Sequence, residues 1–246
     1  MSDWIYGRNP IYEVLRAARR EITLLQIARG VQRSDRIVDI LELAENKGIR
    51  IEEVPRNVLD KRERHNQGVM LQVGEYSYQT IHDVEANIHS SNVPGFILIL
   101  DSLQDPQNLG TLLRTAEAVG VHGVVLPYRR AAAVTPAVVN ASSGASEHLT
   151  IIQANLAQTI DALKQMGIWV YGLDSGPDAQ PVSQLNLDGP VALVVGNEGE
   201  GLRQLVRKSC DVILQLPMAG KIESLNASVA GSIALYMAWQ ARKYKS

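Results

Sequence analysis

Three polar segments in the second half of the chain each follow a short, β-branched apolar run, and this pattern constrains the fold more than any other feature. The apolar runs cover residues 96–100, 191–195 and 212–216, and the segments that follow are rich in glycine and asparagine. In open α/β sheets, ligands bind at the carboxyl ends of the strands, and glycine lets the backbone approach a ligand closely. The sequence therefore predicts that three strand ends line one pocket.

Strands and helices alternate along most of the chain. The pattern from residue 96 onward predicts strands at 96–100, 123–126, 149–152, 168–173, 191–195 and 211–216, and helices at 109–119, 136–142, 155–166, 201–208 and 226–243. This interleaving predicts an α/β fold with a mostly parallel sheet and helices on both faces. Residues 1–78 alternate on a smaller scale and predict a separate α/β domain. We interpret the polar stretch 79–94 as a linker and 95–246 as the second domain.

Composition excludes several classes of protein. A hydrophobic content of 46% over 246 residues is enough for a sizeable core. Residues 1–10 lack the apolar region of a signal peptide. The chain also contains no run of about 18 apolar residues, the length that would predict a membrane span. We therefore expect a cytoplasmic protein. The single Cys210 cannot form an internal disulfide or a zinc site by itself, and we expect it to pack as a small hydrophobic side chain.

Basic residues gather in the first domain, although the net charge of the chain is −2. Residues 1–78 contain 13 of the 24 lysines and arginines against 12 acidic residues, whereas residues 79–246 contain 11 against 14. One basic cluster consists of Arg16, Arg19 and Arg20, and another runs from Lys61 to His65. Each could be a solvated helix face or part of a surface that binds nucleic acid.

Common catalytic and cofactor motifs are missing. The glycines at 196–201 are not spaced as in the dinucleotide-binding motif G-x-G-x-x-G. The chain also lacks the G-K-[ST] segment of a phosphate-binding loop. The segment around Ser143 does not match a nucleophile elbow. Histidines are scattered, so no metal site is expected.

The same segments resemble, in order, the three signature motifs of the SpoU (TrmH-type) branch of the SPOUT RNA 2′-O-ribose methyltransferases. The first motif is filled by Asn108, Gly110, Arg114, Ala116 and Gly120, the second by residues 196–201, and the third by Pro217, Met218, Gly220, Ser224, Leu225, Asn226 and Ser228. The match runs from about residue 96 to 243. Residues 6–10 and 64–68 resemble the L30e-like substrate-binding domain of the ribosomal-RNA members.

The resemblance implies S-adenosylmethionine as the methyl donor and a deep C-terminal trefoil knot around its pocket. It assigns to the cofactor pocket Gly196, Leu216, Met218, Ser224 and Leu225. Taken alone, the two leucines could equally be core residues. RNA contacts are expected from Arg8, Arg62, Arg64, Asn66 and Gln67 in the N-terminal domain.

By motif position, the catalytic residues are Arg114, Asn108, Glu198 and Asn226. Arg114 is assigned to activation of the ribose hydroxyl, either as a base or as a cation that stabilises the developing alkoxide, and the high pKa of arginine favours the second role. Asn108 and Asn226 could instead cap helices. Glu198 could be a first-turn carboxylate favoured by the helix dipole.

The resemblance also implies a partner and a target. Members form homodimers, and the small and apolar residues of 226–243 could contribute to the interface. The N-terminal domain favours a guanosine of large-subunit ribosomal RNA as the target. The alternatives are a transfer-RNA methyltransferase, an antibiotic-resistance methyltransferase of the same RNA, and a non-catalytic RNA-binding protein that assists ribosome assembly.

Overall fold

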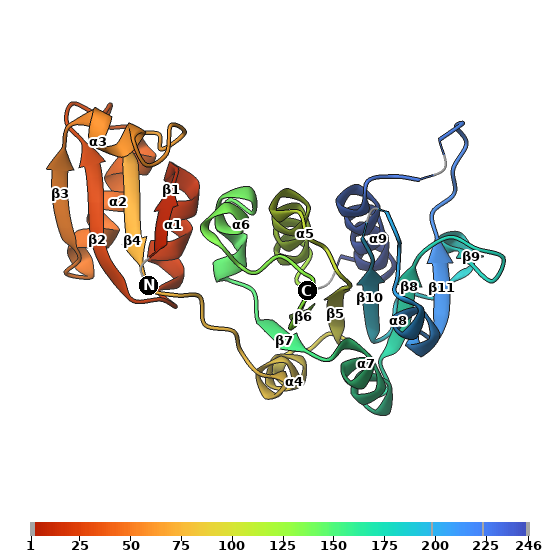
Figure 1. The fold of residues 1–246 in the computed structure, drawn as a ribbon. Helices are drawn as coiled ribbons and strands as arrows, with labels where there is room; N and C mark the ends of the chain where they lie inside the picture. Colours follow the sequence, from red (N-terminus) through yellow and green to blue (C-terminus); the bar gives the residue numbers. More distant parts are fainter. Residues whose placement is uncertain (1–2, 198, 223, 245–246) are drawn as a thin grey trace. The chain divides into compact units, whose positions relative to one another are not determined.

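The computed structural model describes residues 3–197, 199–222 and 224–244. The chain divides into two compact units. The first comprises Met1–Ser77 and Ala133–His148, and the second comprises Tyr78–Ala132 and Leu149–Ser246. Each unit has its own sheet (Figure 1).

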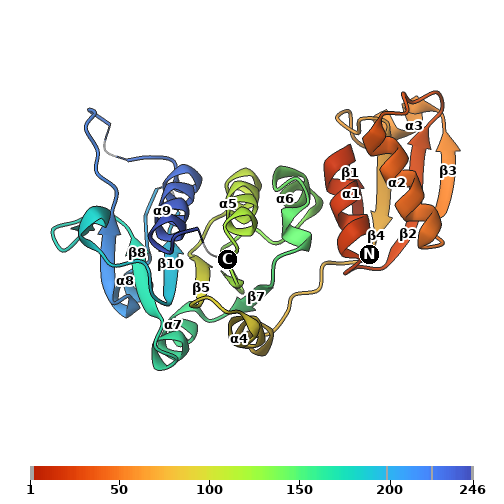
Figure 2. The same ribbon diagram turned by 180° about the vertical axis from the view of Figure 1, so that it is seen from behind.

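The second unit is built on a seven-stranded parallel sheet, visible from both sides in Figures 1 and 2. Its strands are β5 (Phe96–Leu100), β6 (Gly123–Pro127), β7 (Ile151–Ala154), β8 (Trp169–Leu173), β9 (Gln180–Pro181), β10 (Val191–Val195) and β11 (Val212–Gln215). They lie in the order β7-β6-β5-β10-β8-β11-β9, and every pairing is parallel. The central strands β5 and β10 are fully buried, as expected for a sheet covered on both faces.

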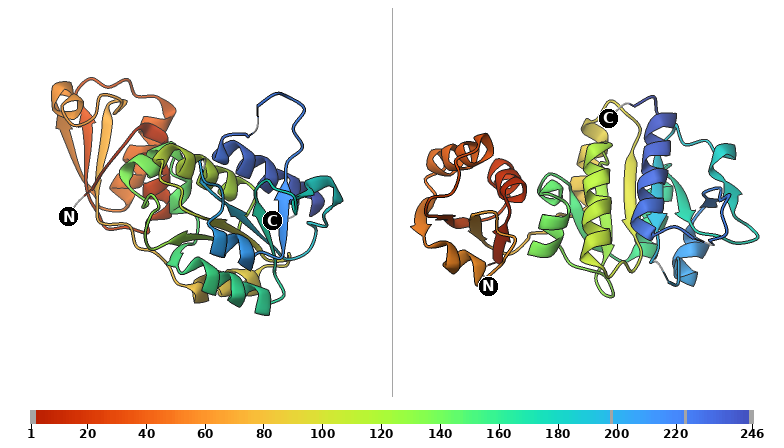
Figure 3. Two further views of the ribbon diagram at one scale, coloured as in Figure 1. Left: turned by 45° about the vertical axis from the view of Figure 1, so that its right-hand side comes forward. Right: turned by 90° about the horizontal axis from the view of Figure 1, so that it is seen from above.

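Helices cover both faces of this sheet. Helices α5 (Pro106–Ala118) and α9 (Ala227–Ala241) lie side by side on one face, and α4 (Ile81–Ser90), α7 (Leu156–Gln165) and α8 (Gln204–Ser209) cover the other (Figure 3). Ile97, Ile99 and Val194 face α4, α7 and α8 in one apolar cluster. On the α9 side, a methyl group on Gly231 would approach Leu112 of α5 and Val195 of β10 to 2.6 and 3.0 Å, which shows how closely the helix is packed.

The first unit has a four-stranded mixed sheet. Its strands are β1 (Asp3–Tyr6), β2 (Ile22–Ala28), β3 (Arg50–Val54) and β4 (Val69–Val73), in the order β1-β4-β2-β3. Only β2 and β3 pair in parallel; β4 is antiparallel to both of its neighbours. Helices α1 (Arg8–Ala17) and α2 (Asp35–Asn46) pack together, and α3 (Arg56–Asp60) contributes Leu59 to a small apolar cluster with Met70.

Residues 133–148 belong to the first unit, although they lie between β6 and β7 of the second sheet in the sequence. They form α6 (Pro136–Ala141) and a short 3₁₀ helix, Ala145–Glu147. Glu147 accepts two hydrogen bonds from Arg20, at 2.6 and 3.0 Å, and both side chains are only 1% exposed. Nearby, Asn140 donates to the carbonyl of Tyr6 at 2.9 Å. A buried bidentate ion pair therefore fastens this segment to the chain near α1.

Most elements expected from the sequence are present within a few residues. Strand 191–195 agrees to the residue. The main difference is α4, which lies inside the stretch interpreted as a linker; Val84 of α4 is fully buried against Gly123 of β6. Most side chains of α4 are polar and only one narrow stripe of the helix is buried, so the sequence pattern did not indicate a helix here. The two-residue strand β9 (Gln180–Pro181) was also not expected from the sequence. The trefoil knot stays a prediction, because strand order alone does not establish threading.

Cys210 packs against the core of the second unit. Burial raises the pKa of its thiol to about 12, and the neighbouring Asp211 carboxylate adds to the effect. The thiol is therefore neutral near pH 7 and is a poor nucleophile. No helix among the described residues combines the length and the apolar character needed to span a bilayer.

Glu147→Ala tests the buried ion pair. The change leaves the Arg20 cation buried without its partner, which typically costs about 3–5 kcal/mol. We expect the unfolding transition of the first unit in urea to move to lower concentration by a corresponding amount. Glu13→Ala is the control, because Glu13 contacts His148 in a partly exposed pair worth at most about 1 kcal/mol. If both variants unfold at nearly the same urea concentration as the wild type, the buried ion pair does not hold the segment in place.

Candidate functional site

A pocket of about 720 Å³ opens at the carboxyl ends of β8, β10 and β11. Its walls come from Leu173 to Ser175, Val195 to Asn197, Gly199 to Gly201, Gln215 to Met218, and the start of α9. All five residues assigned to the cofactor, Gly196, Leu216, Met218, Ser224 and Leu225, line it. Two of the three predicted strand ends thus meet here. The third predicted strand end, at β5, is not among the lining residues; β5 pairs with β10, and its end leads into α5.

The glycine-rich segment after β10 folds back on itself. Asn197 and Gly201 exchange backbone hydrogen bonds at 3.2 and 3.1 Å, and the Asn197 side chain accepts from the backbone N–H of Gly199 at 2.7 Å. A methyl group on Gly196 would lie 2.4 Å from the carbonyl of Gly201, closer than real atoms approach. Gly196 is therefore required by the backbone of its own loop, not only by a ligand. Glu198, assigned a catalytic role, lies outside the described residues.

A strand end that we did not single out in the sequence also reaches the pocket. Asp174 and Ser175 follow β8 directly, and both line the wall. The Asp174 carboxylate accepts from the backbone N–H of Ser175 at 2.8 Å and lies 3.5 Å from the Arg207 guanidinium. The available signal was the Asp-Ser-Gly segment at residues 174–176, another polar, glycine-containing stretch after an apolar run.

Asn108 and Asn226 come together from helices that are distant in sequence. The Asn226 amide donates to Oδ1 of Asn108 at 3.1 Å, and the Ser228 hydroxyl lies 2.9 Å from the same oxygen. Asn226 also caps α9, because its Oδ1 accepts from the N–H groups of Ser228 and Val229. Capping and contact with the other motif coexist in one side chain.

Asn108 is not the cap of α5. That role belongs to Asp105, whose carboxylate accepts from the N–H of Gln107 at 3.0 Å. Asn108 lies within the first turn, half-buried, where its side chain meets the start of α9. The alternative interpretation of Asn108 as a helix cap is therefore wrong.

Arg114 is exposed on α5. It follows Asn108 by six residues, which places it about 9 Å further along the helix and on a face about 120° away. The structure thus joins Asn108 with Asn226 and sets Arg114 on a different face of the same helix. Among the described residues there is no group of three His, Cys, Asp or Glu side chains that could hold a metal ion.

The residues assigned to RNA lie in the first unit, near the start of α1 and in the loop before β4. Arg8 donates its backbone N–H to the Gln67 side chain at 2.9 Å and its guanidinium to Ser34 at 3.0 Å. Arg62 lies 4.2 Å from the centre of the Trp4 ring and donates to Gln26 at 2.6 Å. Arg64 is exposed.

Asn66 differs from its neighbours because it is fully buried. Its amide donates to Asp60 at 2.7 Å and to the Glu63 carbonyl at 2.6 Å, and its oxygen accepts from the N–H of Gly68 at 2.7 Å. These contacts engage both ends of the amide. In this structure Asn66 shapes the loop that presents Arg62, Arg64 and Gln67.

Comparison with protein families identifies both parts of the chain. Residues 95–236 match the SpoU rRNA Methylase family, and residues 4–79 match a family described as RNA 2′-O ribose methyltransferase substrate binding. The chain belongs to the SpoU methyltransferase family. Members use S-adenosylmethionine as methyl donor, and the chain is an RNA methyltransferase of this family.

Relatives align over nearly the full length. A Bacillus subtilis (strain 168) protein named as a TrmH family tRNA/rRNA methyltransferase is 41% identical over 98% of this chain and 96% of its own. A TrmH-family protein from Porphyromonas gingivalis is similar in structure, with a TM-score of 0.74 at 26% identity over 96% of this chain and 88% of its own. The SpoU methyltransferase AviRb from Streptomyces viridochromogenes, determined with AdoMet, superimposes with a TM-score of 0.81 at 23% identity over 99% and 92% of the two chains.

The pocket residues fit S-adenosylmethionine. The volume of the pocket lies within the range of about 300–1,000 Å³ that is usual for small-molecule sites. The walls combine apolar side chains with the carboxylates of Asp174 and Glu200, which suit the positive sulfonium and ammonium groups of the cofactor. Gly220, which belongs to the third motif, is not among the residues that line this pocket, and a methyl group built there meets no atom within 4 Å.

Gly196→Ala should damage this pocket. The added methyl group meets backbone atoms of Gly201 and Leu202, so the loop that lines the pocket must move. We expect affinity for S-adenosylhomocysteine, measured by titration calorimetry, to fall at least about tenfold, about 1.4 kcal/mol. Gly220→Ala is the matched control, because the same change meets open space. Equal affinities of the two variants would contradict this account of the loop.

Proposed function

We propose that this chain transfers a methyl group from S-adenosylmethionine to the 2′-hydroxyl of a guanosine in large-subunit ribosomal RNA. The observation that supports this most is the convergence of the motifs. The five residues assigned to the cofactor line one pocket, and the Asn108–Asn226 hydrogen bond lies where α9 begins, at the edge of that pocket. The description of the family matched by residues 95–236, SpoU rRNA Methylase, favours a ribosomal target.

The reaction sets clear demands on the protein. The bound cofactor supplies a methyl group activated by its sulfonium. A ribose hydroxyl is a weak nucleophile until its proton leaves, so the site must align the reacting atoms and help remove that proton. The Arg114 guanidinium holds an RNA phosphate and stabilises the developing alkoxide. Asn108 and Asn226 orient the ribose, and the proton passes to water or another group.

RNA is held in part by the first unit in this proposal. Arg62 and Arg64 present cations at the loop before β4, and the stacking of Arg62 on Trp4 keeps its guanidinium in place. Gln67 and Arg8, which are joined by a hydrogen bond, are the other members of this proposed RNA-binding surface.

Tritiated S-adenosylmethionine tests the reaction directly. We expect label to enter unmodified large-subunit ribosomal RNA and to survive alkaline hydrolysis in dinucleotides, because a 2′-O-methyl group blocks cleavage at its own phosphodiester. Label in transfer RNA would keep the enzyme and change its target. Bound cofactor without label in either RNA would indicate an assembled particle as substrate. Absence of cofactor binding would favour a non-catalytic RNA-binding protein.

Arg114→Ala separates chemistry from binding. We expect the rate of methyl transfer to fall at least about 100-fold, because a group that stabilises developing charge is lost. Affinity for S-adenosylmethionine should stay within a few-fold. Arg114 is exposed, so the variant should fold. A large loss of cofactor affinity at full rate would contradict the assigned role.

We also propose a homodimer in which α9 contributes to the interface. Its inner face buries Gly231, Ala234 and Ala238. Its outer face exposes Val229, Ile233 and Tyr236 by 46%, 40% and 48%, at helical spacing. A helix that is apolar on all sides is usually covered on all sides.

Ile233→Asp should convert the dimer to a monomer, because it places a charge in an apolar interface. Light scattering coupled to gel filtration at micromolar concentration gives the molar mass. Val38→Asp is the control, since Val38 of the first unit is equally 40% exposed. A wild-type monomer, or an Ile233→Asp dimer, would rule out this interface.

A further inference from the structure

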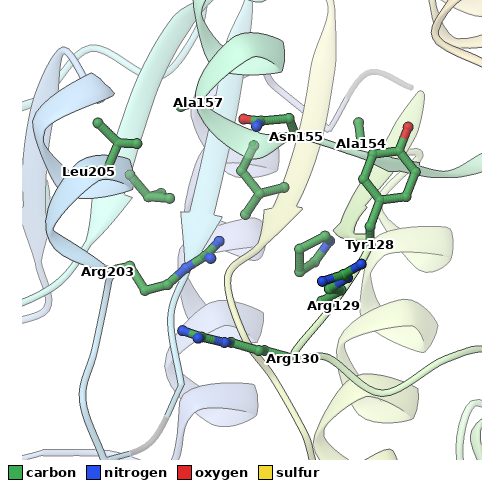
Figure 4. Close-up of a pocket in the computed structure, with 11 residues that line it drawn as sticks. Tyr128, Arg129, Arg130, Ala154, Asn155, Ala157, Arg203 and Leu205 are labelled. Atoms are coloured by element: carbon green, nitrogen blue, oxygen red, sulfur yellow. The ribbon is translucent and has the colours of Figure 1, made fainter.

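A second pocket, of about 440 Å³, lies at the carboxyl ends of β6 and β7 in the second unit. It is drawn in Figure 4, and its polar wall comes from Tyr128, Arg129, Arg130, Asn155 and Arg203. None of these residues belongs to the cofactor pocket or to the three family motifs. The pocket therefore needs an explanation of its own.

Its lining is strongly basic. Three guanidinium groups face it, and no carboxylate is among the lining residues, in a chain whose net charge is −2. Arg129 and Arg130 are exposed, and neither forms a hydrogen bond or an ion pair with any residue that the structure describes. A concave surface with unpaired arginines attracts anions, and the planar guanidinium suits phosphate.

The third arginine is held in place. Arg203 donates its Nε to Asp101 at 2.6 Å and its backbone N–H to the other carboxylate oxygen at 2.8 Å. Asp101 is fully buried at the end of β5. The remaining guanidinium N–H groups stay available, and in Figure 4 Arg130 and Arg203 extend toward the same part of the pocket.

The rim offers a flat surface for a base. Tyr128 is 69% exposed and Leu205 is 66% exposed, although large apolar side chains gain little from facing water. Unpaired RNA bases stack on aromatic rings while arginines hold the adjoining phosphates. A ring and three cations around one cavity match a nucleotide of single-stranded RNA.

The position relative to the cofactor pocket suits a single RNA segment. Strand β6 is two places from β10 in the sheet, about 10 Å at the usual strand spacing. The segment after β10 joins the two pockets, since Glu200 and Gly201 line the first and Arg203 and Leu205 line the second.

We propose that this basic pocket binds an unpaired nucleotide flanking the methylated one, with its adjoining phosphates on Arg129, Arg130 and Arg203 and its base on Tyr128. The proposal rests on the proposed function for the identity of the ligand as RNA. It adds a subsite on the methyltransferase unit that selects an unpaired neighbour of the target.

Fluorescence anisotropy with a fluorescein-labelled oligouridylate tests the pocket without requiring methyl transfer. We expect the double variant Arg129→Ala, Arg130→Ala to bind at least about tenfold more weakly at low salt. Its slope of log affinity against log salt, measured over about 50–200 mM, should fall by about 1.4, because two phosphate contacts are lost. Both side chains are exposed, so the fold should persist.

Two further variants separate stacking from charge. Tyr128→Ala should lower affinity about tenfold at an unchanged salt slope, and Tyr128→Phe should bind as the wild type does. The double variant Lys208→Ala, Lys243→Ala removes the same charge from exposed positions outside the pocket and serves as the control. If the arginine variant loses no more than this control, the subsite is ruled out.

Titration with S-adenosylmethionine and methyl-transfer kinetics distinguish the two proposals. Methyl transfer by the arginine variant with an unchanged KM for RNA would overturn the subsite and leave the proposed function in place. Pocket-dependent binding of the oligonucleotide by a protein that binds no S-adenosylmethionine would support the subsite and overturn the proposed function.

Discussion

The direct pairing of β5 with β10 determines how the rest of the second unit is arranged. These strands are separated by about ninety residues in the sequence and align Phe96 to Leu100 with Val191 to Val195 along their full length. Because every pairing in the sheet is parallel, all of its carboxyl ends lie at one edge. Polar loops that are scattered along the chain are thereby collected beside one another, and both pockets of this unit open there.

The same contacts serve stability and the site. Asn226 caps α9 and at the same time binds Asn108 of α5, so one residue of the third motif also caps the last helix. Gly196 is required by the turn that closes on Gly201. Under the proposed function, substitutions at these positions affect both folding and catalysis, so cofactor affinity must be measured separately from turnover to tell the two effects apart.

The first unit depends on a segment borrowed from the middle of the chain. Glu147 pairs with Arg20 where both side chains are almost fully buried, and α6 packs on β1. A chain cut after residue 78 would leave Arg20 buried without its partner, at a cost typical of broken internal ion pairs. Studies of RNA binding by this unit therefore need the intact chain.

The sequence by itself determined the element types, because parallel strands buried on both faces are continuous apolar runs and their ends are marked by glycine and asparagine. It also predicted that the five residues assigned to the cofactor lie together, because the three ordered motifs have a recognisable spacing, and all five line one pocket. Only the tertiary structure decided that residues 133–148 join the first unit, that α4 packs where a linker was expected, and that Asn66 is buried. It also decided that Tyr128, Arg130 and Arg203 share a cavity. These outcomes depend on which distant surfaces meet, and a pattern of local spacing carries no information about that.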